Sequence, residues 1–301
     1  MALRRCLCGL VLLLLAAAPA SAQVKLAWNF RKGEKFYQET STTLKQLTRI
    51  RGQENLQEQE HVSVTSFTVK DRNQDGSVVL EQRIESIKIG GKTEVSGTAE
   101  RLLRAMEGST FTLTLSSDMR ITSFEGYDEL VQRVAGDDPA ALKVVQTLLS
   151  RETLQSMTEE AFAFLPREAV RPGKSWERKL TASLGPIGSV IGTQTYTYEG
   201  PTTLGERPVQ KILMDAKLSY RPPQADPGLL PFQVRSGELR VQSGRGHLWF
   251  DDKLGRLVQS EMTMHIKGSL SLSSQGQEFT LELDQDQMVK IRITDEPPAV
   301  R

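Results

Sequence analysis

Residues 258–272 read VQSEMTMHIKGSLSL, and the spacing of apolar side chains in this stretch decides the fold class. Apolar and polar residues alternate with a period of two, which is the spacing of a β-strand with one buried and one solvated face. The alternation predicts one long strand of an antiparallel sheet. Its apolar positions are Val258, Met262, Met264, Ile266, Leu270 and Leu272.

The same period recurs along most of the chain. The segment Ser274-Gln275-Gly276-Gln277 is typical of a hairpin turn, and the strand that follows it carries apolar residues in one phase from Phe279 to Ile293. We therefore predict a mainly β (α+β) fold made of antiparallel sheet. Similar alternation occurs around residues 60–70, 77–89, 111–115, 193–198 and 209–220.

Residues 126–165 depart from this period. Apolar residues at i, i+3, i+4 and i+7 from Tyr127 to Val134 form a helical stripe, and Asp138-Pro139 is a favourable start for a second helix. A third helical stretch must end at Pro166. We expect this helical connector to cover one face of a sheet.

A repeat relates the two halves of the chain. FRKGEKF at residues 30–36 resembles VRPGKSW at residues 170–176, and strand–turn–strand patterns follow both in the same order. This similarity predicts two related β units from a duplication. The first spans 23–125, the helical connector spans 126–165, the second unit spans 166–294, and 295–301 is a flexible tail.

Residues 1–22 have the features of a secretory signal peptide. Arg4 and Arg5 precede an apolar run over residues 10–18, and Ala20-Ser21-Ala22 is an A-x-A cleavage site. Cleavage between Ala22 and Gln23 would export the remaining chain to the periplasm or the extracellular space. The apolar run is too short to span a bilayer, and no other stretch approaches that length, so we expect no transmembrane anchor.

The composition of the exported part excludes several function classes. Both cysteines, Cys6 and Cys8, leave with the signal peptide, which excludes disulfides and thiol chemistry. The remaining chain has 36 Lys+Arg against 37 Asp+Glu, and this balance gives no reason to expect nucleic acid as a partner.

One motif suggests a metal. Asp71-Arg72-Asn73-Gln74-Asp75-Gly76 matches the start of an EF-hand calcium loop, in which Asp71, Asn73 and Asp75 would be the ligands. The twelfth position is Gln82 rather than the required Glu, and strand rather than helix precedes the motif. The alternative is a hairpin turn, where Asn, Asp and Gly are favoured. We predict no other cofactor.

Catalytic residues are not apparent. The chain lacks a G-x-S-x-G motif, and its three histidines have no neighbours at metal-ligand spacing. The acidic pairs, such as Glu159-Glu160, are adjacent in sequence, and adjacent side chains on a helix or strand point apart.

Several motifs in a fixed order resemble an uncharacterised family of exported bacterial β-rich proteins, catalogued as a domain of unknown function. These are F-x-x-G-x-x-F at 30–36, P-G-x-x-W at 172–176 and G-x-L-x-F-D-x-x-x-G-R-L at 246–257. The order covers almost the whole exported chain, which departs from it at Asp118-Met119-Arg120, where a turn glycine is expected. The resemblance implies no activity and no functional residues.

Two classes of function remain open from the sequence. The first is a non-enzymatic binding or cell-envelope protein whose sheets and helices hold an apolar or extended ligand. Its concrete form is a lipid or lipoprotein carrier built on a half-open β-barrel with a helical lid. The second class is a hydrolase of an unrecognised kind, with carboxylates brought together from distant positions.

Overall fold

The computed structural model describes residues 23–92, 103–184, 187–223, 230 and 232–299. The predicted signal peptide, including Ala22 of the cleavage site, lies outside the described residues, and Gln23 is the first residue within them. The signal peptide and its cleavage remain predictions.

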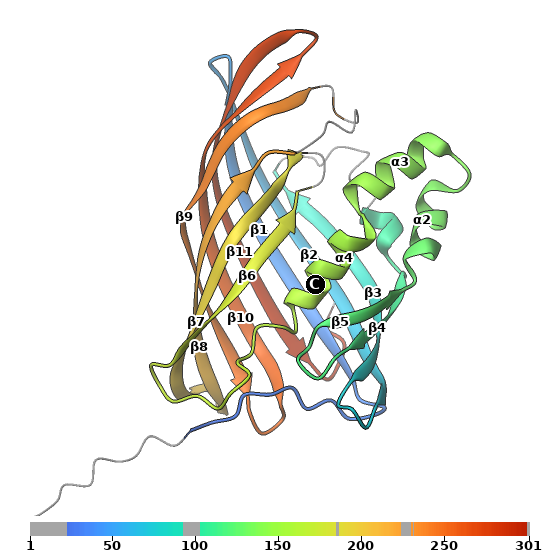
Figure 1. Cartoon of the computed structure of the whole chain (residues 1–301), viewed down its shortest axis with the longest axis vertical. Coiled ribbons are helices and arrows are strands. Elements are labelled where there is room, and N and C mark those ends of the chain that lie inside the picture. Colours follow the sequence, from blue (N-terminus) through green and yellow to red (C-terminus); the bar gives the residue numbers. More distant parts are fainter. Residues whose placement is uncertain (1–22, 93–102, 185–186, 224–229, 231, 300–301) are drawn as a thin grey trace, which may run out of the picture.

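The described strands form one antiparallel sheet of eleven strands, which confirms the mainly β fold class (Figure 1). The sheet is open, with the order β5-β4-β3-β2-β1-β11-β10-β9-β8-β7-β6, so β5 and β6 are its two edges. The strands are β1 Lys35–Ile50, β2 Gln53–Arg72, β3 Val78–Gly91, β4 Thr110–Leu115, β5 Ile121–Glu125, β6 Ser175–Ser183, β7 Ser189–Leu204, β8 Arg207–Arg221, β9 Gln233–Asp251, β10 Arg256–Ser274 and β11 Gln277–Thr294.

The first and last strands join the two halves of the chain. β1 pairs with β11 along its length, from Tyr37 opposite Thr294 to Ile50 opposite Leu281. Every other pairing in the sheet is between strands adjacent in sequence. The two predicted units therefore contribute two meanders to a single continuous sheet.

Three helices occupy the predicted connector, namely α2 Tyr127–Ala135, α3 Pro139–Leu148 and α4 Arg151–Glu160. The hydroxyl of Ser150 caps α4 by accepting a hydrogen bond from the backbone N–H of Thr153. The helices lie beside the β1–β5 end of the curved sheet, and the upper ends of β9, β10 and β11 extend beyond them (Figure 1).

An aromatic cluster attaches the helical region to the sheet. Trp28 lies between Phe162 and Phe164 after α4 and Phe250 of β9, with ring centroids 5.5, 5.8 and 5.7 Å away. The indole N–H of Trp28 donates to the carbonyl of Phe162 at 2.8 Å, so this buried polar group is satisfied. The side chains of Phe36 and Phe67 extend the cluster onto β1 and β2.

The two repeated motifs form the same turn. Gly33 and Gly173 have φ angles of 84° and 86°, a left-handed conformation that glycine adopts without steric cost. Their N–H groups donate to Val69 and Tyr198 at 2.8 and 2.7 Å, on the second strand of the hairpin in each half. This shared geometry supports the duplication, which stays a prediction.

The expected turn glycine is absent at residue 119, and Met119 adopts the left-handed conformation instead. Its φ is 61°, against 68° for Gly255 in the corresponding turn of the second half. A non-glycine residue in this region carries a steric cost of about 1–2 kcal/mol. Met119 also packs against the buried core, which offsets part of that cost.

A buried arginine lies at the junction of the two meanders. The Arg256 side chain is 5% exposed and bonds both Glu34, at 3.2 Å, and Asp295. Its guanidinium also lies over the ring of Phe36, 5.4 Å from the centroid. Arg256 thus ties the start of β10 to the turn before β1 and to the residue after β11.

Removal of this arginine should weaken the junction. We expect Arg256→Ala to lower the free energy of unfolding by about 3 kcal/mol, because Glu34 would keep a largely buried and uncompensated charge. Urea denaturation followed by circular dichroism measures the loss. Arg292→Ala is the control, since its ion pair with Glu39 on the sheet surface should contribute under about 1 kcal/mol. Equal losses in the two variants would contradict the assignment.

Candidate ligand-binding face

The two faces of the sheet have different surroundings. We call inner the face that contacts Trp28 and the segment after α4, and outer the opposite face. Phe250 and Phe67 point to the inner face because their rings contact Trp28 and Phe162, respectively. Phe36 points to the same face because its ring stacks on Phe67. Side chains alternate along a strand and paired residues point to the same side, so the strand register assigns the remaining positions.

An apolar stripe occupies the inner face over β9, β10 and β11. Met262 and Ile291 pack against the buried core, and the stripe continues beyond them with side chains that are only half-buried. Half-burial of so many apolar groups on one face marks a surface able to receive an apolar ligand. The stripe consists of Leu239, Val241, Met262, Met264, Ile266, Leu281, Leu283, Val289 and Ile291.

A neutral polar stripe lies next to it, over β1, β2 and the middle of β11. Hydrogen bonds connect neighbours along a strand, as from Gln38 to Thr40 at 3.2 Å and from Gln285 to Gln287 at 3.4 Å. Each contact engages one atom of each amide group that takes part, whereas an amide side chain offers two donor hydrogens and an acceptor. The stripe consists of Gln38, Thr40, Thr42, Gln46, Thr48, Asn55, Gln57, Gln59, His61, Ser63, Thr65, Gln285 and Gln287.

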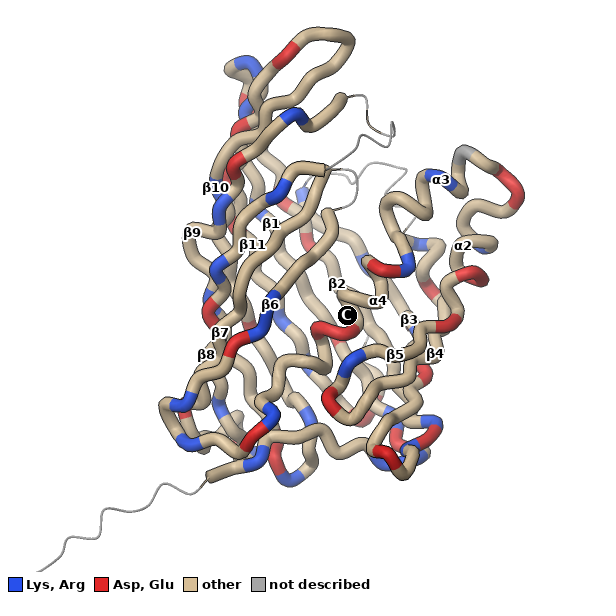
Figure 2. Tube along the Cα trace, viewed as in Figure 1, with Lys and Arg blue, Asp and Glu red and all other residues tan. Residues whose placement is uncertain are grey.

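Formal charge separates the two faces. We compare the described residues of β1, β2 and β6–β11 that lie beyond the aromatic cluster. At the inner-face positions among them, Arg178 is the one residue with a fixed charge. The outer face of the same strands carries ion pairs, and residues of both signs are interspersed along the strands (Figure 2). These pairs include Lys45–Glu58, Arg245–Asp215, Lys267–Asp284, Lys290–Glu261 and Arg292–Glu39.

Edge strand β6 holds the inner-face arginine. The guanidinium of Arg178 donates from Nη2 to the carbonyl of Leu165 at 2.7 Å, while its buried Nε has no partner among the described residues. Burial lowers the pKa of Arg178. The neighbouring Trp176 stacks on Tyr196 of β7, with centroids 5.8 Å apart and planes at 14°. This cluster lies at the β6 edge of the inner face.

The last residue of α4, Glu160, lies close to Tyr196 of this cluster. Glu160 is exposed, yet desolvation by the surrounding protein and secondly the charge of Glu159 raise its pKa from 4.5 to about 7. Glu160 lies close enough to Tyr196 for its charge to help burial raise the pKa of that phenol. Glu159 points elsewhere, to Arg120 and to the backbone N–H of Ile121 at 2.8 Å.

The raised pKa of Glu160 predicts a pH-dependent stability. In the unfolded chain this carboxyl ionises near pH 4.5, whereas in the folded chain it ionises near pH 7. The folded state binds more protons in that window, so its stability falls as pH rises from about 4.5 to about 7. Thermal unfolding across this range should show a shallower decline for Glu160→Gln, and a higher Tm than the parent at pH 8. Glu168→Gln, in the segment after α4, is the control and should follow the parent. A slope unchanged by Glu160→Gln would contradict the prediction.

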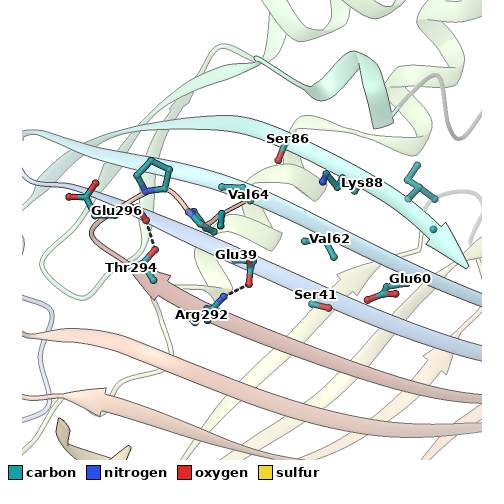
Figure 3. Close-up of a pocket in the computed structure, with 15 residues that line it drawn as sticks. Glu39, Ser41, Glu60, Val62, Val64, Ser86, Lys88, Arg292, Thr294 and Glu296 are labelled. Atoms are coloured by element: carbon teal, nitrogen blue, oxygen red, sulfur yellow. Dashed lines mark hydrogen bonds and ion pairs between the residues drawn. The ribbon is translucent and has the colours of Figure 1, made fainter. Parts of the chain in front are cut away.

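A cavity of about 830 Å³ lies on the outer face instead (Figure 3). The C-terminal segment 295–299 crosses β1–β3 there and covers Val62 and Val64. The Glu39–Arg292 ion pair spans its floor at 2.9 Å. Both acidic and basic side chains line this cavity, so it fits an apolar ligand less well than the inner face does. The flexible tail predicted at 295–301 stays a prediction.

The structure places the three predicted calcium ligands in the β2–β3 hairpin. Asp71 accepts hydrogen bonds from Lys32 Nζ at 3.1 Å and from the backbone N–H of Arg72, and these bonds lower its pKa. Asn73 donates to the hydroxyl of Ser77, and Asp75 accepts from the backbone N–H of Ser77. Across the described part of the chain, no group of three or more His, Cys, Asp or Glu side chains could hold a metal ion.

These bonds favour the hairpin interpretation, and the calcium site remains a testable hypothesis. Because Lys32 and the turn backbone already engage the side chains of Asp71 and Asp75, we expect no heat on isothermal titration with calcium and no shift of Tm at millimolar calcium. Titration with magnesium controls for ionic strength. Saturable heat that Asp75→Asn abolishes would establish the site.

Three comparisons place this geometry among known proteins. Residues 77–201 match a family of unknown function (DUF6263). The sequence-based resemblance to a family of unknown function is confirmed over this stretch, which runs from β3 to near the end of β7. No curated protein sequence matches the chain.

Similar solved structures cover most of this chain at low identity. A Bacteroides fragilis protein, described as exported and as having a YmcC-like fold, shares 9% identity over 89% of this chain and 99% of its own, with a TM-score of 0.25. OpdL of Pseudomonas aeruginosa shares 10% over 86% and 98%, with a TM-score of 0.21. These scores are too low to carry an argument about function. No described helix is long and apolar enough to cross a membrane.

Proposed function

We propose that this chain is an exported, non-enzymatic binding protein that holds an apolar or extended ligand against the inner face of its sheet. The observation that carries the proposal is a contrast in charge between the two faces. The outer face is rich in ion pairs, whereas Arg178 is the one fixed charge among the described inner-face positions of β1, β2 and β6–β11 beyond the aromatic cluster. The charged outer face shows the surface that this sheet presents to solvent. The inner face has far fewer fixed charges, and an apolar ligand requires such a surface because charges beneath it would have to be desolvated.

A lipid or lipoprotein carrier is the concrete form of this proposal. The predicted signal peptide supports export, and the helices α2–α4 beside the open sheet correspond to the predicted cover. Methionine is a suitable lining residue because its unbranched, polarizable side chain adapts to ligands of variable shape. Met262 and Met264 supply two such side chains on one strand.

The hydrolase alternative has less support. It requires two carboxylates that face each other, and the acidic pair nearest to the inner face is Glu159-Glu160. The side chain of Glu159 binds Arg120 and Ile121, whereas Glu160 lies toward Tyr196. Their divergence leaves Glu160 as a single carboxyl, which lacks the acid–base partner that hydrolysis needs.

A charge placed on the inner face should abolish ligand binding. We expect Met264→Glu to lose at least tenfold in affinity for the uncharged fluorophore N-phenyl-1-naphthylamine, because a carboxylate would have to be desolvated beneath the ligand. Met288→Glu is the matched control, since Met288 lies on the outer face of the neighbouring strand and is 41% exposed. Fluorescence titration measures both variants, and circular dichroism verifies their fold.

Native mass spectrometry of the protein purified from its own host provides a second measurement. A co-purified lipid or peptide would support the proposal. Equal affinity of the two glutamate variants and the parent for the fluorophore would refute binding at the inner face, even if the protein binds apolar compounds elsewhere.

A further inference from the structure

The two stripes of the inner face differ in chemistry and lie side by side. At the centre of the sheet, Gln46 of β1 is paired with Gln285 of β11, and Gln285 is paired in turn with Ile266 of β10. The neutral polar stripe therefore changes to the apolar stripe within the width of two strands, about 10 Å. A ligand that spans both stripes must itself have an apolar part and a polar part.

The polar stripe is suited to an uncharged polar group. Its residues are amides, hydroxyls and one imidazole, with donors and acceptors in similar supply. An anionic headgroup would leave water without a lysine or arginine to receive it, and a cationic one would find no carboxylate. Arg178, on edge strand β6, lies six strand positions from β1 in the sheet and donates to Leu165, so it does not serve this stripe.

We infer that the ligand is an uncharged lipid amphiphile, with its acyl chain on the apolar stripe of β9–β11 and a neutral, hydrogen-bonding headgroup on the polar stripe of β1–β2. This inference rests on the proposed function and specifies its ligand class. Glu160 lies close to Tyr196 of β7, which stacks on Trp176 of β6 on the other side of the apolar stripe, so its charge lies away from the headgroup position.

A panel of ligands with a C18 hydrocarbon chain and different headgroups tests the class. The C18 compounds are monoolein, which is neutral, oleate, which is anionic, oleylamine, which is cationic, and 1-octadecene, which has no headgroup. Each competes with N-phenyl-1-naphthylamine for the full exported chain at pH 8. We expect monoolein to displace the fluorophore at concentrations at least tenfold lower than the other three.

A charge substitution on the polar stripe should change the preference. In Gln46→Lys we expect oleate to bind about tenfold more tightly than in the parent, because one charge-assisted hydrogen bond contributes about that factor. Thr43→Lys is the matched control, since Thr43 lies on the outer face of the same strand. Thr48→Lys, nearer the end of the β1–β2 hairpin, provides a second variant if Gln46→Lys fails to fold.

The outcomes separate the two proposals. Preference for monoolein, with a gain for oleate in the inner-face lysine variant alone, supports the neutral amphiphile. Displacement by oleate or oleylamine as effective as by monoolein overturns the ligand class and leaves the proposed binding function intact. If neither the fluorophore nor any of the four C18 compounds binds, the proposed function is overturned, and the ligand class with it.

Discussion

The pairing of the first strand with the last is the interaction on which the rest of the structure depends. β1 and β11 meet along almost their full length although more than two hundred residues separate them in the chain. Without this seam the chain would be two separate meanders, each with an additional exposed edge. The buried Arg256 stabilises the seam at one end by bonding groups that precede β1 and follow β11.

The seam also determines where the two chemistries of the inner face meet. β1 and β2 bring the neutral polar residues from the first half of the chain, and β9–β11 bring the apolar residues from the second half. Neither half alone presents an amphipathic surface of this kind. The aromatic cluster around Trp28 then attaches the helices at one end of the sheet, and the remaining inner face extends beyond them.

Glu159 and Glu160 show how tertiary structure gives two adjacent residues different environments. Glu159 and Glu160 are adjacent, yet one carboxylate joins α4 to β5 through Arg120 and Ile121, and the other lies toward Tyr196 of β7. The sequence suggested only that adjacent acidic residues point apart. The raised pKa of Glu160 depends first on desolvation by the surrounding protein, which local sequence does not reveal.

Local sequence was sufficient to predict the strands and the helical connector. Alternation at residues 258–272 and 279–293 and the helical spacing at 127–134 are local properties that follow from periodicity. The order of short motifs likewise indicated a resemblance to a family of unknown function, and a family model of that kind matches residues 77–201. Strand order, register and the identity of the inner face were decided only by the tertiary structure. They depend on pairings such as Phe36 with Phe67 and Gln46 with Gln285. Each pairing joins two segments that are distant in sequence, and neither segment alone identifies its partner.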